Sequence, residues 1–324
     1  MRPGMIRDRR TFVLETSPSW SVRPSQFKPG ATRLDIFVCV KQVLDARMPL
    51  EVTPEGLVVQ RGCPATFILN PADHCALQEA LRIRAQDAGS RVIVITVGPK
   101  RAQSTLSVCL AAGADSAIHI LSEDSLAIDP FCVARALSVE LGKRAFDLIL
   151  CGDRTLDDGA SEVGPVLAEL LGIPQVTGVV KLTFSKEKAS VIGERKQERG
   201  YRQAVSVRLP VLVAVNSSIC QPRYVTTRAQ RYAAKTIDEH CTTVPFDLST
   251  SIDHPSPLRK VLRLSPPRPR AKKIAQIDSG MATEDRIAQM LGLTAPVKQG
   301  KGVSGDPEQL ADDIVAFLSD KGLV

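Results

Sequence analysis

The loop at residues 152–163 has the residue types expected of a phosphate-binding site. Gly152 and Gly159 carry no side chain, so the backbone can approach a ligand closely there. The loop follows a short apolar run at residues 146–150, typical of a buried strand, and leads into a helical pattern that starts near Ser161. Backbone N–H groups at such a helix N-terminus bind anions. The segment therefore predicts a site for a phosphate-bearing ligand.

Two adjacent acids in this loop, Asp157 and Asp158, are the residue types of a metal site or an acid–base pair. No histidine lies nearby in the sequence to complete a catalytic set. Because the histidines are scattered along the chain, a Ser–His–Asp or Cys–His arrangement has no support. We therefore interpret the acids as caps near the helix start and do not predict an enzyme that catalyses with its own side chains. The histidines are His74, His119, His240 and His254.

A second turn, Asn70-Pro71-Ala72-Asp73, reads as a helix start. Asn70 suits the N-cap, Pro71 suits the first helical position, and Asp73 suits the positive end of the helix dipole. This turn and the loop at 152–163 each follow a predicted strand. Because the carboxyl ends of parallel strands meet at one edge of a sheet, we expect the two turns to face one nucleotide.

Apolar runs and helical patterns alternate in the first half of the chain. Strands are predicted at 34–43, 91–97, 116–120 and 146–150, and helices after Asn70, at 102–112, at 130–141 and from 161. Continuous apolar strands between helices predict an α/β fold with a doubly wound, mostly parallel, Rossmann-like sheet. Four later runs, at 179–182, 189–194, 203–209 and 211–215, are joined by short turns and predict an antiparallel or mixed extension of the sheet.

We expect three regions. Residues 1–34 form an N-terminal extension that is disordered or resembles a targeting segment, since it is rich in arginine and poor in acids. Residues 35–242 form the nucleotide-binding domain. Residues 243–324 form an extended, proline-rich arm that ends in a helix from Asp306. The G-x-G-x-x-G match at 300–305 follows no strand, so we interpret it as a linker.

The net charge of +7 does not indicate nucleic-acid binding. The first 34 residues hold seven basic and two acidic side chains, which is +5 and leaves +2 for the rest of the chain. A nearly neutral body lacks the basic surface that nucleic acid requires. No apolar run approaches the roughly 18 residues of a membrane span.

The eight cysteines form no C-x-x-C pair, so zinc or iron–sulfur ligation has no support. Several lie within apolar runs, such as Cys39 between Val38 and Val40. We interpret them as small buried apolar residues of a protein in a reducing compartment. The expected location is the cytoplasm, or the mitochondrial matrix if the source is eukaryotic.

An ordered set of motifs over residues 35–235 resembles the beta subunit of electron transfer flavoprotein. The matching stretches are Val40-Lys41-Gln42-Val43, Asn70-Pro71-Ala72-Asp73, Val97-Gly98-Pro99, Ala112-Gly113-Ala114-Asp115, Phe146-Asp147-Leu148-Ile149, Gly172-Ile173-Pro174-Gln175-Val176-Thr177, Leu209-Pro210 and Pro222-Arg223-Tyr224.

The resemblance implies a heterodimer with an alpha subunit that carries the redox FAD, while the beta subunit binds AMP and helps to hold that FAD. It implies an electron carrier that receives electrons from a dehydrogenase and passes them to a quinone reductase or a similar acceptor. By position, the resemblance assigns the nucleotide contacts to Cys39, Asn70, Pro71, Ala72, Asp73, Val97, Gly152, Asp157, Asp158, Gly159, Ala160, Ser161, Glu162 and Val163.

Two stretches depart from the family pattern. Glu162 replaces the usual glutamine, and the ending Val163-Gly164-Pro165 is nearer to members that bind a second FAD in place of AMP and bifurcate electrons. The segment Pro222-Arg223-Tyr224 corresponds to the family's partner-docking segment, but Thr227 stands where relatives that dock acyl-CoA dehydrogenases carry a leucine. The bifurcating subunit is therefore the alternative, and an adenine-nucleotide hydrolase or ligase on a related fold is a second one.

Overall fold

The computed structural model describes residues 11–15, 33–48, 50–53, 58–60, 64–122, 129–185, 189–246, 283–284, 287 and 306–320. The chain divides into two compact units, Met1–Pro267 and Arg268–Val324, and each is treated by itself. The proline-rich stretch expected at 255–269 and the glycine motif at 300–305 lie outside the described residues.

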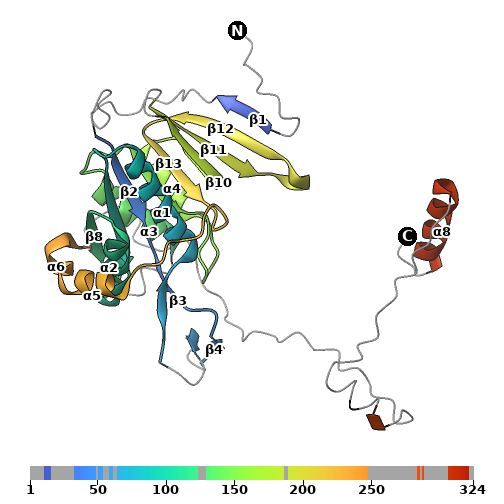
Figure 1. Cartoon of the computed structure of the whole chain (residues 1–324), viewed down its shortest axis with the longest axis horizontal. Helices are drawn as coiled ribbons and strands as arrows, with labels where there is room; N and C mark the ends of the chain where they lie inside the picture. The colour runs from blue at the N-terminus through green and yellow to red at the C-terminus, as the bar shows by residue number, and fades with distance from the viewer. Residues whose placement is uncertain are drawn as a thin grey trace. The chain divides into compact units, whose positions relative to one another are not determined.

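The first unit is built on one large sheet with the order β1-β12-β11-β10-β13-β9-β2-β7-β8-β14 among the described strands. Its centre is parallel, as predicted from the continuous apolar runs. Figure 1 shows these strands between layers of helices. The central strands are β13 (Val211–Val215), β9 (Leu148–Gly152), β2 (Asp35–Cys39), β7 (Arg91–Gly98) and β8 (Ser116–Leu121).

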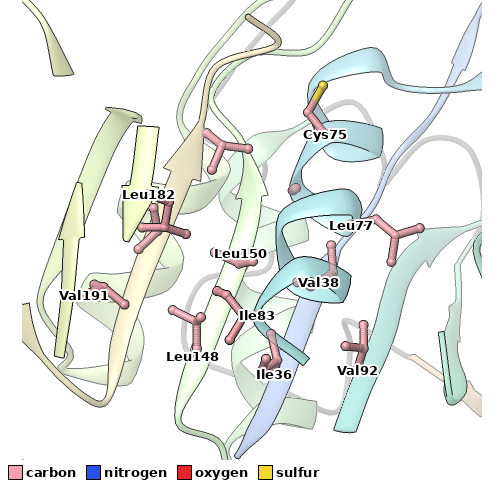
Figure 2. Packing of buried hydrophobic residues seen from close by; sticks show 14 of the residues in the cluster. Ile36, Val38, Cys75, Leu77, Ile83, Val92, Leu148, Leu150, Leu182 and Val191 are labelled. Carbon is pink, nitrogen blue, oxygen red and sulfur yellow. The ribbon is translucent and has the colours of Figure 1, made fainter. Parts of the chain in front are cut away.

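Helices cover both faces of this sheet. One core joins the strands to α1 (Pro71–Gln86) and α2 (Gln103–Ala112), and it contains Ile36, Val38 and Leu77 (Figure 2). The other core joins them to α3 (Pro130–Leu141) and α4 (Val163–Leu171). Successive residues of a strand point to opposite faces, so β2 gives Ile36 to the first core and Phe37 to the second. The predicted doubly wound α/β fold is confirmed.

Local sequence explains the helix ends. At α3 the Asp129 carboxylate accepts a hydrogen bond from the Phe131 N–H at 2.8 Å, with Pro130 at the first helical position. Gly113 and Gly172 end α2 and α4 in the left-handed region, with φ of 118° and 64°. Short 3₁₀ turns η1 (Lys100–Ala102) and η3 (Glu198–Gly200) complete the local structure.

The antiparallel extension is also present. Strands β10 (Gln175–Ser185), β11 (Ser190–Lys196) and β12 (Arg202–Arg208) pair in sequence order, and β10 continues the sheet from β13. Within the expected N-terminal extension, β1 (Thr11–Glu15) pairs in parallel with β12. These five residues differ from the expectation of a disordered or targeting-like segment, because TFVLE is apolar and β-branched enough to form an edge strand.

The expected strand at 34–43 is shorter, since β2 stops at Cys39 and β3 (Gln42–Leu44) leaves the main sheet to pair with β6 (Phe67–Leu69). Beyond β3 lies a second hairpin of β4 (Leu50–Val52) and β5 (Val58–Gln60).

At the other end of the unit, α5 (Thr227–Lys235), α6 (Ile237–His240) and β14 (Cys241–Pro245) were not predicted. Because β14 pairs in parallel with β8, the sheet extends past the domain boundary expected at residue 242.

In the second unit, α8 (Pro307–Asp320) follows Asp306, where the sequence predicted a helix. Its apolar stripe includes Ile314 and Phe317, which are 58% and 60% exposed. Across the described residues, no helix is both long and apolar enough to cross a membrane.

Candidate functional site

A cavity of about 300 Å³ lies at the carboxyl ends of β2, β7 and β9. This is the lower end of the size range of small-molecule sites. The two predicted turns contribute to one site, as expected for the edge of a parallel sheet. Of the predicted contacts, the lining includes Cys39, Asp73, Val97, Gly152, Asp158, Ala160, Ser161, Glu162 and Val163.

Asn70 is the N-cap residue of α1, as predicted, but its side chain binds the loop at 152–163 and not the helix start. Its amide Nδ2 donates to the Arg154 carbonyl at 3.1 Å, and its Oδ1 accepts from the Leu156 N–H at 3.1 Å. The prediction of a side-chain cap is wrong, since no such bond forms at this helix start. The Asn70 side chain bonds to the loop and not to the helix start because these bonds satisfy two backbone groups of a loop that packs on it. Pro71, Ala72, Asp157 and Gly159 likewise do not line the cavity.

Asp73 joins the two turns. Its Oδ2 accepts from the Lys41 N–H and its Oδ1 from the Gly152 N–H, both at 2.8 Å. The carboxyl is 5% exposed and sits between the segment after β2 and the end of β9. One side chain therefore fixes the separation of two walls of the cavity.

Burial raises the pKa of Asp73 to about 6, although the hydrogen bonds from Lys41, Gly152 and Asn70 and the Lys41 charge act in the opposite direction. The two N–H donors therefore offset only part of the free-energy cost of removing the Asp73 carboxylate from water.

Gly152 is required by this contact. A Cβ at this position would lie 2.4 Å from the Asp73 Oδ1 and 2.7 Å from the Ala72 Cβ. Neither group is the end of a long flexible side chain. The sequence predicted that this glycine lets a ligand approach the backbone. In the structure it lets the end of β9 approach α1.

The two loop acids, Asp157 and Asp158, form ion pairs with Lys41. The Lys41 Nζ lies 2.7 Å from the Asp157 Oδ2 and 3.8 Å from the Asp158 Oδ2. Burial alone would raise the pKa of Asp157, but the Lys41 charge and hydrogen bonds outweigh it and lower that pKa. The ion pair connects the loop to the segment after β2, as the Asp73 bonds do from the other side.

Asp158 also organises the loop from within. It accepts a short hydrogen bond from the Thr155 hydroxyl and a bond of 3.1 Å from the Ala160 N–H. The loop then turns at Gly159 and Ser161, whose φ angles are 62° and 59°. A serine in the left-handed region is uncommon and is found in ligand-binding loops whose surroundings impose it. Neither acid caps α4, whose N-cap residue is Glu162 and which has no side-chain cap bond, so the predicted capping role is wrong and the acids instead bond within the loop and to Lys41.

The start of α4 faces the cavity. Val163 and Gly164 belong to its first turn, where N–H groups have no partner within the helix, and both residues line the cavity. The positive end of the helix dipole adds to their attraction for an anion. Glu162 also lines the cavity, so a negative charge lies beside this N-terminus.

Two cationic lining residues were missed by the sequence analysis as ligand contacts, Arg101 and Arg154. Arg101 stacks on the Phe67 ring at 4.6 Å. The Arg154 guanidinium forms no ion pair or side-chain hydrogen bond among the described residues. Arg154 is the third residue of the loop at 152–163. Its place directly after β9 is the signal that could have identified it, because strand ends converge at this edge.

Apolar side chains form the rest of the wall. Pro130, Val133 and Leu137 of α3 lie opposite Cys39 and Val97 at the strand ends. Burial raises the pKa of the Cys39 thiol, so this sulfur is a neutral apolar surface. Gly178, with φ of 67° at a bulge in β10, completes the lining. The lining thus combines apolar side chains with charged and backbone polar groups.

Side-chain catalysis has no support from the histidines of the structure. His119 is fully buried and its Nε2 lies 3.0 Å from the Gly98 carbonyl, while His74 lies on α1 outside the cavity lining. Among the described residues, no group of histidine, cysteine, aspartate and glutamate is arranged to hold a metal ion.

The segment predicted for docking lies apart from the cavity lining, between β13 and α5. Pro222, Arg223 and Tyr224 are exposed, and Tyr224 is 83% exposed. Thr226 caps α5 by accepting from the Ala229 N–H at 3.3 Å, so Thr227 is the first residue of the helix. Tyr232, on the same helix, is 66% exposed.

Comparison with known proteins gives a consistent result. The electron transfer flavoprotein domain family matches residues 65–241. The electron transfer flavoprotein subunit beta of Thermoanaerobacterium thermosaccharolyticum is 37% identical over 192 residues, 59% of this chain and 71% of the relative. The mitochondrial subunit beta of Oryza sativa subsp. japonica is 32% identical over 240 residues, 74% of this chain and 92% of the relative. The caffeyl-CoA reductase-Etf complex subunit CarD of Acetobacterium woodii is 36% identical over 193 residues.

The fold and the cavity define an α/β protein with a cavity of about 300 Å³ at the carboxyl edge of a parallel sheet. With more than half of its length matched, the chain belongs to the electron transfer flavoprotein family, in its beta-subunit branch. The resemblance found in the sequence is therefore confirmed.

Proposed function

We propose that the cavity binds AMP as a structural nucleotide. The observation that carries this proposal is that one cavity of about 300 Å³ is lined both by Arg154 and by the first-turn residues Val163 and Gly164 of α4. The phosphate would bind near these residues, where charge and helix dipole both attract it. The adenine would lie between Cys39 and Val97 and the apolar residues of α3.

The second candidate is a second FAD, as in an electron-bifurcating subunit. Glu162 favours it, because a carboxylate beside the phosphate end weakens the case for AMP. The size of the cavity favours AMP, since FAD contains an AMP half and a flavin half and needs more space than this. Flavin counting decides: one AMP and one FAD per heterodimer support simple transfer, whereas two FAD and no AMP support bifurcation.

The chain would act as an electron carrier subunit in a heterodimer with an alpha subunit that holds the redox FAD. Electrons would enter from a dehydrogenase and leave to a quinone reductase or similar acceptor. The exposed segment Pro222-Arg223-Tyr224, with Thr227 beside it, is the proposed docking site for such a partner, and α8 with the arm before it is proposed to pack on the alpha subunit. The free cysteines of the described residues suit a reducing compartment such as the cytoplasm or the mitochondrial matrix.

An adenine-nucleotide hydrolase or ligase remains the alternative of another class. It would require Asp157 as a catalytic acid or base. The ion pair of Asp157 with Lys41 and its absence from the cavity lining argue against that role. ATP turnover by the isolated chain that disappears in Asp157→Asn would overturn the carrier proposal.

The test of AMP binding is Arg154→Ala in the complex copurified with the alpha subunit. Losing a charge-assisted bond to phosphate costs about 2 kcal/mol, so AMP dissociates about thirtyfold more readily. The measurement is AMP released by acid per heterodimer after dialysis. Arg208→Ala, at an exposed site at the end of β12, is the matched control and should keep its AMP. Equal AMP retention in both variants would refute the assignment of Arg154.

A further inference from the structure

Two cysteines that are 145 positions apart meet beside the first turns of α1. The Cys75 thiol donates to the Cys220 carbonyl at 3.3 Å and to the Ser217 carbonyl at 3.4 Å. The Cys220 thiol donates in return to the Cys75 carbonyl at 3.9 Å. Figure 2 shows Cys75 on α1 at the border of the core.

The two sulfur atoms differ in access. Cys75 is 2% exposed, whereas Cys220 is half-buried in the segment that follows β13. Both neighbouring backbones are fixed, since Cys75 belongs to α1 and the Asn216 amide Nδ2 donates to Asp153 at 2.8 Å. A reagent can therefore reach Cys220 first, and Cys75 already lies next to it.

We propose that Cys75 and Cys220 form a redox site, at which a small disulfide such as oxidised glutathione converts the two thiols into one intramolecular disulfide. The Cys220 thiolate would attack the glutathione disulfide, which releases one glutathione thiol and leaves glutathione on Cys220. The Cys75 thiolate would then attack the Cys220 sulfur and release the second glutathione thiol. Two S–H bonds are lost and one S–S bond forms, while the two electrons and two protons appear in the reduced glutathione.

The environment sets the pace of this reaction. Burial, followed by the neighbouring Cys75, raises the pKa of Cys220 to about 12, and burial raises that of Cys75 as well. Because the thiolate is the reacting form, the rate should rise about tenfold for each pH unit between neutral pH and the pKa. The dithiol is thus stable in a reducing compartment and closes only under sustained oxidation.

Closure would link two functional parts of the chain. Cys220 lies two residues before Pro222, and Cys75 lies two residues after Asp73, which holds the cavity walls. A disulfide would tie the segment leading to the exposed Tyr224 to the helix that shapes the cavity. It would also stabilise the fold, because it closes a long loop of the unfolded chain.

The experiment treats the full chain, copurified with its partner subunit, with oxidised glutathione at pH 7, 8 and 9. After the remaining thiols are blocked, peptide mapping by mass spectrometry should find a link between the peptides of Cys75 and Cys220, formed about tenfold faster per pH unit. The midpoint of thermal unfolding should rise. Cys220→Ser and Cys75→Ala should each abolish the link, whereas Cys241→Ser, at a half-buried cysteine on β14, should leave it unchanged.

A stable glutathione adduct on Cys220 without the link, a link to any other cysteine, or no reaction at pH 9 would each overturn the proposal. If Cys75→Ala does not fold, Cys220→Ser decides alone, because that side chain is only half-buried and serine is similar in size.

Discussion

The cavity and the exposed segment Pro222-Arg223-Tyr224, proposed above for docking and called the docking segment here, differ in how their polar groups are bonded. Around the cavity, polar groups are bonded to each other: Asp73 to two backbone N–H groups, Asn70 to the loop, and Lys41 to Asp157. In the docking segment, Arg223 and Tyr224 extend into solvent. The first region is fixed before any ligand arrives, whereas the second offers side chains that gain a partner only on binding.

Because of this difference, the effects of substitutions on stability and on partner binding should separate between the two regions. Changes at the cavity should alter folding and nucleotide retention together, since the same bonds serve both. Changes at the docking segment should alter association alone, because exposed side chains away from caps contribute little to stability. Each variant below tests that separation.

The largest effect is expected for Gly152→Ala. The new Cβ would displace the Asp73 carboxyl and break its bond to the residue 152 N–H. Overpacking and a lost charged hydrogen bond together should lower the free energy of unfolding by about 4 kcal/mol. Chemical denaturation measures the stability, and acid release measures the bound nucleotide, which should also be lost.

Gly98→Ala is the matched control. It lies at the end of β7 in the same cavity, but its Cβ would meet only the Ala102 Cβ at an ordinary 3.5 Å. It should stay within about 1 kcal/mol of the wild type. If the two alanines cost the same, the close approach at Gly152 is not the reason for its glycine.

The second prediction concerns the pH dependence that Asp73 gives to stability. Its pKa is about 6 in the folded protein against a usual 3.8, so the folded state binds the proton more tightly. The contribution of Asp73 is therefore fully present below the unfolded pKa of 3.8 and is lost as pH rises through about 6, by about 3 kcal/mol in all. Asp73→Asn cannot ionise, so its stability relative to wild type should improve by about this amount between pH 3 and pH 7.

Denaturant unfolding of both proteins at several pH values measures this difference, and other titrating groups cancel between them. Curves that stay parallel across the range would show that the carboxyl is not strained by burial. The Asp73 carboxyl at the cavity would then contribute as little to stability as the exposed side chains of the docking segment.

The third prediction concerns the other region. Tyr224→Ala should weaken association with the electron-donating dehydrogenase by about 2 kcal/mol, or thirtyfold, if the ring anchors the interface as exposed tyrosines often do. Unfolding free energy and AMP content should not change. Binding is measured by titration with the purified dehydrogenase, and Tyr201→Ala, at the 46% exposed tyrosine beside β12, is the control. Loss of AMP in Tyr224→Ala would contradict the independence of the two regions.

The sequence predicted most of what depends on local or periodic signals. Helix α3 begins and ends as expected, because Asp129 and Pro130 define its start and the apolar face its length. The parallel core follows from continuous apolar strands. By contrast, β14 was missed because CTTVP has no apolar periodicity and owes its conformation to pairing with β8.

Contacts between distant segments could not be predicted in the same way. Asn70 reads as a cap, yet its partners are 84 and 86 positions away. The meeting of Cys75 with Cys220 has no spacing signal at all. The cavity walls could be predicted because the strand ends of a parallel sheet converge. The topology does not predict which side chains line the cavity, and so Arg154 was not predicted.

The smallest effect is expected at Glu162, where the cavity itself departs from the family pattern. Its carboxylate lines the same space as the first-turn N–H groups of α4. If AMP is the ligand, Glu162→Gln removes a like charge near the phosphate and should tighten AMP about fivefold, or about 1 kcal/mol. Glu169→Gln, on the exposed part of α4, controls for net charge. Tighter AMP in Glu162→Gln alone would show that the cavity is an AMP site with one unfavourable charge. Weaker AMP would mean that the carboxylate accepts hydrogen bonds from the nucleotide, and FAD would then have to be tested as the natural ligand.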